Sequence, residues 1–166
     1  QALRKRIPQV GFMKPVGQRY VKRDGYEIDE DVVLMKDVCQ IEDSLADMNP
    51  IVVKRGFTEE YIERGDRNQL VQKIQTCFDR ISRGKELMLI EGTGHAGVGS
   101  VIDLSNASVA KLLGAKVIIL SVGGIGKPVD EITINKSLFD QEGVEVLGAV
   151  INKVRSEKYD KIRRLT

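Results

Sequence analysis

The apolar run Leu-Met-Leu-Ile at residues 87–90, which ends on Glu91 and a glycine-rich turn, is the feature that most constrains how this chain can fold. A continuous hydrophobic run of this length between charged residues and glycines is typical of a strand buried on both faces of a parallel sheet. In open α/β sheets, ligands bind beyond the carboxyl ends of such strands. Glu91 is therefore predicted to face a metal ion or a substrate; the alternative is that its carboxylate only caps the next element.

Strand-like and helix-like segments alternate along the chain. We expect strands near residues 9–13, 87–91, 116–122 and 146–150, and helices near 29–38, 58–83, 106–113 and 128–143, with a break at Gly65 and a final polar helix. Asp29 is predicted to cap the helix that follows it. Residues 1–6 are predicted to be the end of a helix, and the polar residues 18–27 a loop. Alternation of this kind implies βαβ units and a mainly parallel sheet.

Length and composition exclude several classes of protein. A chain of 166 residues suits one domain, and its formal net charge of +2 gives no reason to expect a nucleic-acid partner. No apolar run is long enough to span a membrane, and the first residues lack the apolar core of a signal peptide. Cys39 and Cys77 form neither a close pair nor a metal-binding spacing, which favours reduced thiols and a cytoplasmic location.

Two glycine patterns imitate nucleotide-binding motifs. The glycines within residues 92–97 satisfy G-x-G-x-x-G, but the next predicted strand, 116–122, does not end on the acid that a dinucleotide site needs for the ribose. Residues 124–127 echo a phosphate loop, but the spacing is wrong and Pro128 stands where a magnesium-binding Ser or Thr belongs. Residues 1–166 therefore contain no phosphate loop.

Five segments nevertheless occur in an order known from one family. They are residues 10–16 (Val-Gly-Phe-Met-Lys-Pro-Val), 31–36 (Asp-Val-Val-Leu-Met-Lys), 49–50 (Asn-Pro), 90–94 (Ile-Glu-Gly-Thr-Gly) and 151–154 (Ile-Asn-Lys-Val). With them the chain resembles the dethiobiotin synthetase-like P-loop ATPases, and most closely the ATPase-like domain at the N-terminus of long bacterial phosphate acetyltransferases. The resemblance implies a three-layer α/β sandwich with a mainly parallel sheet, of the P-loop nucleotide hydrolase type.

The same resemblance offers an account of the missing phosphate loop. In this family the loop follows the first strand, and both would precede Gln1. We expect residues 1–166 to be a single dethiobiotin synthetase-like domain that lacks its first strand and its phosphate loop. The alternative is a degenerate relative that has lost nucleotide binding and serves as a scaffold.

The resemblance also implies roles for charged residues near strand ends. Lys14 matches a catalytic lysine that faces the substrate and the transferred phosphoryl group, where a cation would stabilise the oxygens. Asp31 and Glu91 match the two carboxylates that hold Mg²⁺. Read without the resemblance, Lys14 could be a surface lysine with a buried stem, and Asp31 an acid favoured by the helix dipole.

Two further segments complete the expected site. Asn152 matches the residue that reads the adenine edge, and Lys153 beside it belongs to the same nucleotide-binding segment; the alternative for Asn152 is an ordinary turn residue. Thr93, Gly94 and His95 belong to the loop that follows Glu91. His95 could carry a proton, although a lone loop histidine is more often incidental.

Three functions follow from this resemblance. The first is a domain that binds ATP and Mg²⁺ as a regulatory or ligand-sensing module, and the second is an ATP-dependent carboxylate-activating ligase of the dethiobiotin or cobyrinic acid synthase type. The third is the non-binding scaffold. Synthetases of the family carry a small hydroxyl residue and a glycine after Lys-Pro-Val, whereas residues 17–19 here are Gly-Gln-Arg, which argues against the biotin-pathway substrate. The resemblance implies a nucleotide and a small acid as ligands, and a homodimer.

Overall fold

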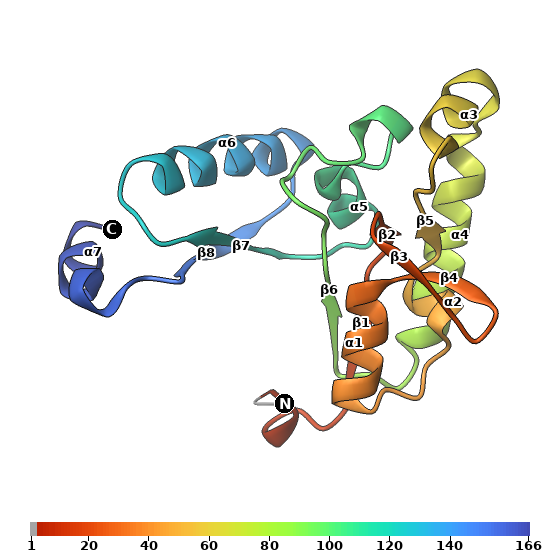
Figure 1. Cartoon of the computed structure of the whole chain (residues 1–166), viewed down its shortest axis with the longest axis horizontal. Coiled ribbons are helices and arrows are strands. Elements are labelled where there is room, and N and C mark those ends of the chain that lie inside the picture. The colour runs from red at the N-terminus through yellow and green to blue at the C-terminus, as the bar shows by residue number, and fades with distance from the viewer. Residues whose placement is uncertain (1–2) are drawn as a thin grey trace.

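A computed structural model of the chain describes residues 3–166 and contains both helices and strands along its whole length (Figure 1). The strands are β1 (Val10–Met13), β2 (Val16–Gly17), β3 (Tyr20–Arg23), β4 (Tyr26–Asp29), β5 (Ile51–Val52), β6 (Leu87–Ile90), β7 (Val117–Val122) and β8 (Val146–Asn152). The α-helices are α1 (Glu30–Cys39), α2 (Leu45–Met48), α3 (Phe57–Arg64), α4 (Arg67–Ile81), α5 (Asn106–Leu112), α6 (Lys127–Glu142) and α7 (Tyr159–Leu165). Short 3₁₀ helices are η1 (Leu3–Lys5), η2 (Ser100–Ile102) and η3 (Ser156–Lys158).

The strands pair in twos, and three of the four pairs are parallel. β1 pairs with β6, β2 with β5 and β7 with β8, each in parallel, while β3 and β4 form an antiparallel hairpin. The predicted α/β fold with parallel pairing is therefore confirmed. The predicted helix end at residues 1–6 corresponds to η1 in the described part, and residues 1–2 lie outside the described residues.

The prediction of a loop at residues 18–27 is wrong, because this segment contains most of the β3–β4 hairpin. Asp24 and Gly25 form its turn, with φ angles of 51° and 81°. Positive φ at both central residues belongs to the type I′ turn, and Asp-Gly is a strong sequence signal for it. All four residues of β3 are exposed, so the strand does not need the apolar run by which a buried strand is recognised.

Three apolar clusters hold these elements together. The first joins β1, β2 and β5 to one face of α4, through residues such as Met13 and Ile74, both fully buried. The second packs α1 and α2 against Phe12. The third covers one face of the β7–β8 pair with α5 and α6, around Ile119 and Phe139. Gly65 separates α3 from α4 as expected, and Asp66 caps α4 by accepting a hydrogen bond from the Asn68 N–H.

Within residues 3–166, every helix is too short or too polar to cross a lipid bilayer.

Candidate functional site

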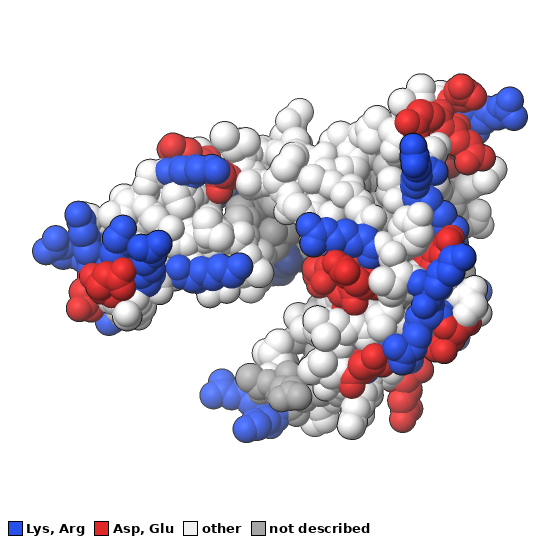
Figure 2. Space-filling view, viewed as in Figure 1, with Lys and Arg blue, Asp and Glu red and all other residues white. Residues whose placement is uncertain are grey.

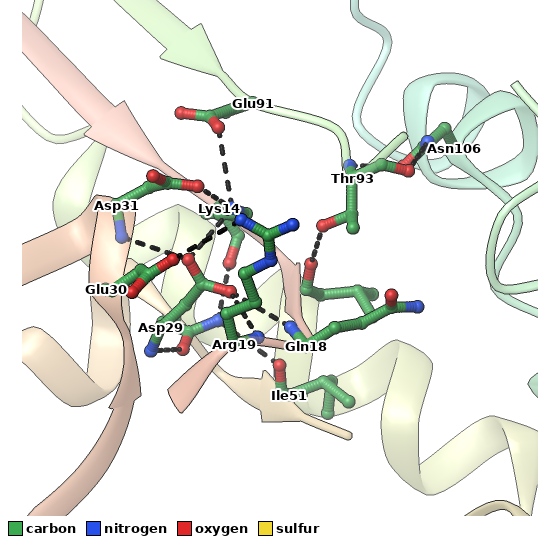
Figure 3. A network of polar contacts seen from close by, with 12 residues as sticks. Lys14, Gln18, Arg19, Asp29, Glu30, Asp31, Ile51, Glu91, Thr93 and Asn106 are labelled. Carbon is green, nitrogen blue, oxygen red and sulfur yellow. Dashed lines mark hydrogen bonds and ion pairs between the residues drawn. The ribbon is translucent and has the colours of Figure 1, made fainter. Parts of the chain in front are cut away.

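Lys14 lies among three carboxylates at the carboxyl ends of β1 and β6 (Figure 3). Because β1 and β6 are parallel neighbours in register to their last residues, Lys14 and Glu91 leave the sheet side by side. The Lys14 Nζ lies 2.8 Å from Asp29 Oδ1 and 3.5 Å from Glu91 Oε1, and it also donates a hydrogen bond to Asp31 Oδ2. The structure thus brings together three residues that the sequence analysis assigned to one site.

Asp29, at the end of β4, is the buried centre of this cluster. Its side chain is 1% exposed, and its Oδ1 accepts hydrogen bonds from Lys14 Nζ and from the Asp31 N–H at 3.1 Å. Its Oδ2 accepts from the main-chain N–H groups of Gln18 and Arg19, at 2.9 and 3.2 Å. The predicted N-cap of α1 is confirmed, and the same carboxylate also positions Lys14 and the segment that follows β2.

Asn49 ties the cluster to the start of β5. Its Oδ1 accepts from the Asp29 N–H at 2.9 Å, and its Nδ2 donates to the Lys14 carbonyl at 2.8 Å and to the Ile51 carbonyl at 3.2 Å. A Cβ on Gly17 would lie 2.6 Å from the Asp29 Cβ and 3.0 Å from the Asn49 Nδ2. Glycine is therefore required at position 17 by the close approach of these two buried side chains.

The charges in the cluster shift one another's proton affinity. Burial alone would lower the pKa of Lys14, but the hydrogen bonds from its ammonium to Asp29 and Asp31 outweigh burial and raise that pKa. Burial alone would raise the pKa of Asp29, but the bond and charge of Lys14 and the N–H groups of Asp31 and Arg19 together outweigh it and lower that pKa. For Glu91 burial dominates and raises the pKa, with Lys14 opposing and Asp31 adding to the effect. Lys14 is therefore held as a cation between acids.

The carboxylates that remain accessible suit a partly protein-bound magnesium ion. The side chains of Asp31 and Glu91 are 43% and 40% exposed, so each keeps an oxygen edge available for a ligand. The residues described here include no group of three or more His, Cys, Asp or Glu side chains arranged to hold a metal. Mg²⁺ commonly takes one or two carboxylates, substrate phosphate oxygens and water rather than an all-protein cage. The donor set fits that arrangement.

The loop after β6 is held in place by Asn106, the first residue of α5, and by a bond to β2. The Asn106 Nδ2 donates to the carbonyls of Thr93 and His95 at 2.8 and 2.7 Å, and its Oδ1 accepts from the Thr93 N–H at 3.3 Å. The Thr93 hydroxyl donates to the Val16 carbonyl at 2.8 Å. A Cβ on Gly92 would lie 2.8 Å from Asn106 Oδ1, so the glycine allows this close contact.

Gly94 and His95 continue this loop after Thr93. Gly94 has φ of 66°, a value that favours glycine. The His95 side chain is exposed, and its Nδ1 accepts the Gly97 N–H at 3.2 Å. The histidine therefore has a local structural contact and no hydrogen bond to Lys14, Asp31 or Glu91 among the described residues.

Asn152 and Lys153 lie apart from this cluster. Asn152 ends β8, next to α7 in the opposite part of the molecule from β1 and β6 (Figure 1). Both side chains are exposed, and Asn152 Oδ1 accepts the Lys153 N–H at 2.8 Å, while Lys153 has φ of 54°. The structure does not bring these two residues to Lys14, and their role in reading a base stays a prediction.

The sequence analysis missed three residues that organise the site: Asp29 as a partner of Lys14, Asn49 as the link to β5, and Asn106 as the residue that holds the loop. Two of these residues stood out in the sequence, Asn49 in an Asn-Pro pair and Asp29 at a helix cap position. Neither pattern shows which residue the side chain contacts. Asn106 carried no signal beyond its place at a helix start.

Comparison with known proteins supports one family. The profile of the family described as "AAA domain" matches residues 1–166. The chain is 29% identical over 159 residues to a cobyric acid synthase of Clostridium perfringens (strain SM101), which covers 84% of this chain and 32% of that protein. It is 23% identical over 144 residues to an ATP-dependent dethiobiotin synthetase of Methanococcus vannielii, covering 86% and 64% respectively.

A third relative extends the match across nearly the whole chain. A phosphate acetyltransferase of Pseudomonas aeruginosa is 27% identical over 164 residues, which is 95% of this chain and 22% of that protein. The chain thus spans between about a fifth and two thirds of the length of these curated relatives.

Proposed function

The chain belongs to the dethiobiotin synthetase-like P-loop ATPase family, a family of ATP-binding, ligase-like domains, and we therefore propose that it binds ATP and Mg²⁺ as a regulatory or ligand-sensing module. The observation that carries this proposal is the convergence of Lys14, Asp31 and Glu91 at the carboxyl ends of β1 and β6. Ligands of open α/β sheets bind at such ends. The match of 95% of this chain to a phosphate acetyltransferase favours a module inside a larger protein.

Each residue of the cluster has a role in this proposal. Asp31 and Glu91 would hold the magnesium ion, which supplies positive charge to phosphate oxygens. The Lys14 ammonium, fixed by Asp29, would stabilise negative charge on the terminal phosphoryl group. A prepositioned cation contributes most because it needs no reorganisation when the charge develops.

We also propose that the phosphate loop lies in a part of the polypeptide outside residues 1–166. The main-chain N–H groups and the lysine of a phosphate loop cradle the β- and γ-phosphates, and residues 1–166 have no such sequence. Residues 1–166 alone should therefore bind Mg-ATP weakly and hydrolyse it negligibly. A cytoplasmic location and a homodimer belong to the same proposal.

A second candidate is a carboxylate-activating ligase, which the similarity to a cobyric acid synthase and a dethiobiotin synthetase favours. In such a reaction a substrate oxygen attacks the γ-phosphorus of ATP and ADP leaves. A nitrogen nucleophile then displaces phosphate from the activated carbon. The amides of Gln18 and Arg19 are already bonded to Asp29, so they are not available to bind such a substrate.

Isothermal titration calorimetry with Mg-ATP tests the proposal on two proteins: residues 1–166 alone, and the polypeptide encoded by the complete reading frame that contains them. We expect weak binding to the first and binding to the second that is lost when EDTA removes Mg²⁺. Sub-micromolar binding to residues 1–166 would contradict the proposed location of the phosphate loop. Absence of binding to the complete polypeptide would favour the scaffold. Phosphate release that depends on a small acid and ammonia would favour the ligase.

A further inference from the structure

Asn135, in the middle of α6, contacts the loop that follows Glu91. Its Oδ1 accepts the Ala96 N–H at 2.6 Å, and its Nδ2 donates to the Glu131 carbonyl of its own helix at 2.7 Å. Because one of these partners is a donor and the other an acceptor, the orientation of the amide is fixed. Among the described residues, the bond to Ala96 is the single hydrogen bond that joins α6 to residues 91–105.

Ala96 is held between two helices through both of its main-chain groups. The residue is 4% exposed and belongs to the apolar cluster around Ile119 and Phe139. Its N–H is bonded to Asn135, and its carbonyl accepts the Ala107 N–H of α5 at 3.1 Å. A buried N–H without an acceptor is costly, so loss of the Asn135 oxygen would make this arrangement of the loop less favourable. Asn135 therefore selects where the loop lies relative to α6.

The same loop leads to the charged cluster. Glu91 is its first residue, and Thr93 is bonded to Asn106 and, through its hydroxyl, to the Val16 carbonyl. The Glu91 Oε1 lies 3.5 Å from Lys14 Nζ and the side chain is 40% exposed, so burial does not fix this carboxylate. Its position depends on the direction in which the main chain leaves β6, and the contacts of the loop set that direction.

The helix α6 belongs to a different part of the molecule from the charged cluster. Figure 1 shows α6 beside the β7–β8 pair and apart from β1 and β6, and Figure 2 shows an open indentation between these two parts. Asn152, which is predicted to read the base, ends β8 in the part that carries α6. The bond between Ala96 and Asn135 therefore links the strand pair of Asn152 to the loop of Glu91.

We propose that Asn135 is a positioning residue for the magnesium side of the site: its amide fixes the loop that begins at Glu91, so that α6, and with it the β7–β8 pair, determines where the Glu91 carboxylate lies. Residues that orient metal ligands without touching the metal commonly change metal affinity by about 10–100-fold when they are removed. This inference rests on the proposed function, because it takes Glu91 as a magnesium ligand.

Two substitutions separate the two bonds that Asn135 makes. Asn135→Asp keeps an acceptor for the Ala96 N–H and loses the donor to the Glu131 carbonyl. Asn135→Ser is too short to reach Ala96, while its hydroxyl can donate to the carbonyl four residues earlier, as Thr133 and Ser137 do in the same helix. Ser137→Ala removes one such bond within α6, leaves the bond to Ala96 in place and is the control.

All variants are made in the polypeptide of the complete reading frame. Mg²⁺ is titrated at a fixed ATP concentration, at a temperature where circular dichroism shows every variant folded. We expect Asn135→Ser to raise the Mg²⁺ concentration for half-maximal ATP binding by about tenfold, and to speed amide hydrogen exchange at Ala96 by at least about tenfold. Asn135→Asp and Ser137→Ala, which keep the acceptor for Ala96, should stay within about threefold of the parent in both measurements.

A double-mutant cycle with Glu91→Gln tests whether Asn135 acts through Glu91. Once the carboxylate is gone, Asn135→Ser should change the Mg²⁺ requirement by at most about twofold more, because two changes that remove the same contact are not additive. A role confined to the packing of α6 would lower the melting temperature and leave the Mg²⁺ requirement unchanged.

Four results would overturn the inference. The first is unchanged exchange at Ala96 in Asn135→Ser, and the second is faster exchange there without a change in the Mg²⁺ requirement. The third is a Mg²⁺ requirement in Asn135→Asp as high as in Asn135→Ser, and the fourth is the full effect of Asn135→Ser in the Glu91→Gln background. Each of these leaves the proposed function standing if the parent binds Mg-ATP. A parent polypeptide that does not bind Mg-ATP would overturn the proposed function, and this inference with it.

Discussion

Replacing Asp29 by alanine should destabilise the protein strongly, because this buried side chain joins several elements of the site. The carboxylate is 1% exposed and accepts hydrogen bonds from the Lys14 ammonium and from the N–H groups of Gln18, Arg19 and Asp31. Removing one partner of a buried ion pair typically costs about 3–5 kcal/mol. The loss of the α1 cap is part of this change and is worth about 1 kcal/mol by itself.

Urea unfolding followed by circular dichroism measures this cost, and thermal unfolding gives a second readout. For a chain of this size, each kcal/mol lowers the melting temperature by about 2–4 °C, so the variant should melt roughly 6–20 °C below the parent. Asp29→Asn keeps the cap and an acceptor oxygen, and should lose about 1–3 kcal/mol because a charged hydrogen bond becomes a neutral one. Asp37→Ala, which removes an exposed ion pair with Arg23, is the matched control and should lose at most about 1 kcal/mol.

The difference in unfolding free energy between the parent and Asp29→Ala should depend on pH, which a loss of packing alone would not produce. The pKa of Asp29 is lowered in the folded state, so its contribution is complete above the ordinary pKa of an aspartate. The contribution is lost as the pH falls through the lowered pKa of the folded protein. The stability gap between parent and Asp29→Ala should therefore narrow under acid conditions. A gap below about 1 kcal/mol at neutral pH, or one equal to that of Asp37→Ala, would refute this reasoning.

Three other changes test the site. Glu91→Gln preserves volume and should weaken Mg-ATP binding to the complete polypeptide by about 1–3 kcal/mol while its melting temperature hardly falls; unchanged binding would make Glu91 a structural cap. Asn152→Ala should erase a preference for ATP over GTP of about tenfold in competition binding, because guanine presents O6 where adenine presents an amino group. Equal discrimination between the two nucleotides in parent and variant would mean that another part of the protein reads the base. Gly17→Ala should lower the urea midpoint of unfolding, because a Cβ there would lie 2.6 Å from the Asp29 Cβ. Gly126→Ala is its control, because a Cβ at position 126 meets no atom within 4 Å. Equal midpoints for both variants would contradict the close packing at Gly17.

Much of the local structure could be predicted from the order of residues. The apolar run at residues 87–90 is the strand β6, Asp29 caps α1, and Gly65 separates two helices, each as expected from signals within a few neighbouring residues. The predicted burial of that strand on both faces is wrong, because Leu89 is 36% exposed and the other three side chains are only partly buried. The β3–β4 hairpin was missed because its short strands mix apolar with charged residues and β3 is exposed throughout, although Asp-Gly at its turn was a usable signal.

The composition of the charged cluster was only partly predictable. Lys14 and Glu91 were each placed at the end of a strand, and the parallel pairing of β1 with β6 brings them together. The bond from Lys14 to Asp29 depends on the hairpin returning the chain to β1, which no local pattern encodes. Asn152 was expected near the same site because it also follows a strand, but β8 belongs to a separate pair.

The amino-acid sequence by itself determined the types of the main elements, the caps and turns that bound them, and the family to which the chain belongs. These depend on periodicity and on contacts between near neighbours, which are properties of short segments. The tertiary structure alone decided that Asp29 holds Lys14, that Asn106 holds the loop after Glu91, and that β6 pairs with β1 while β7 pairs with β8. Those features arise from pairing and packing between residues far apart in the chain, where the free energy of burial and of hydrogen bonding selects one arrangement among many that the same local signals allow.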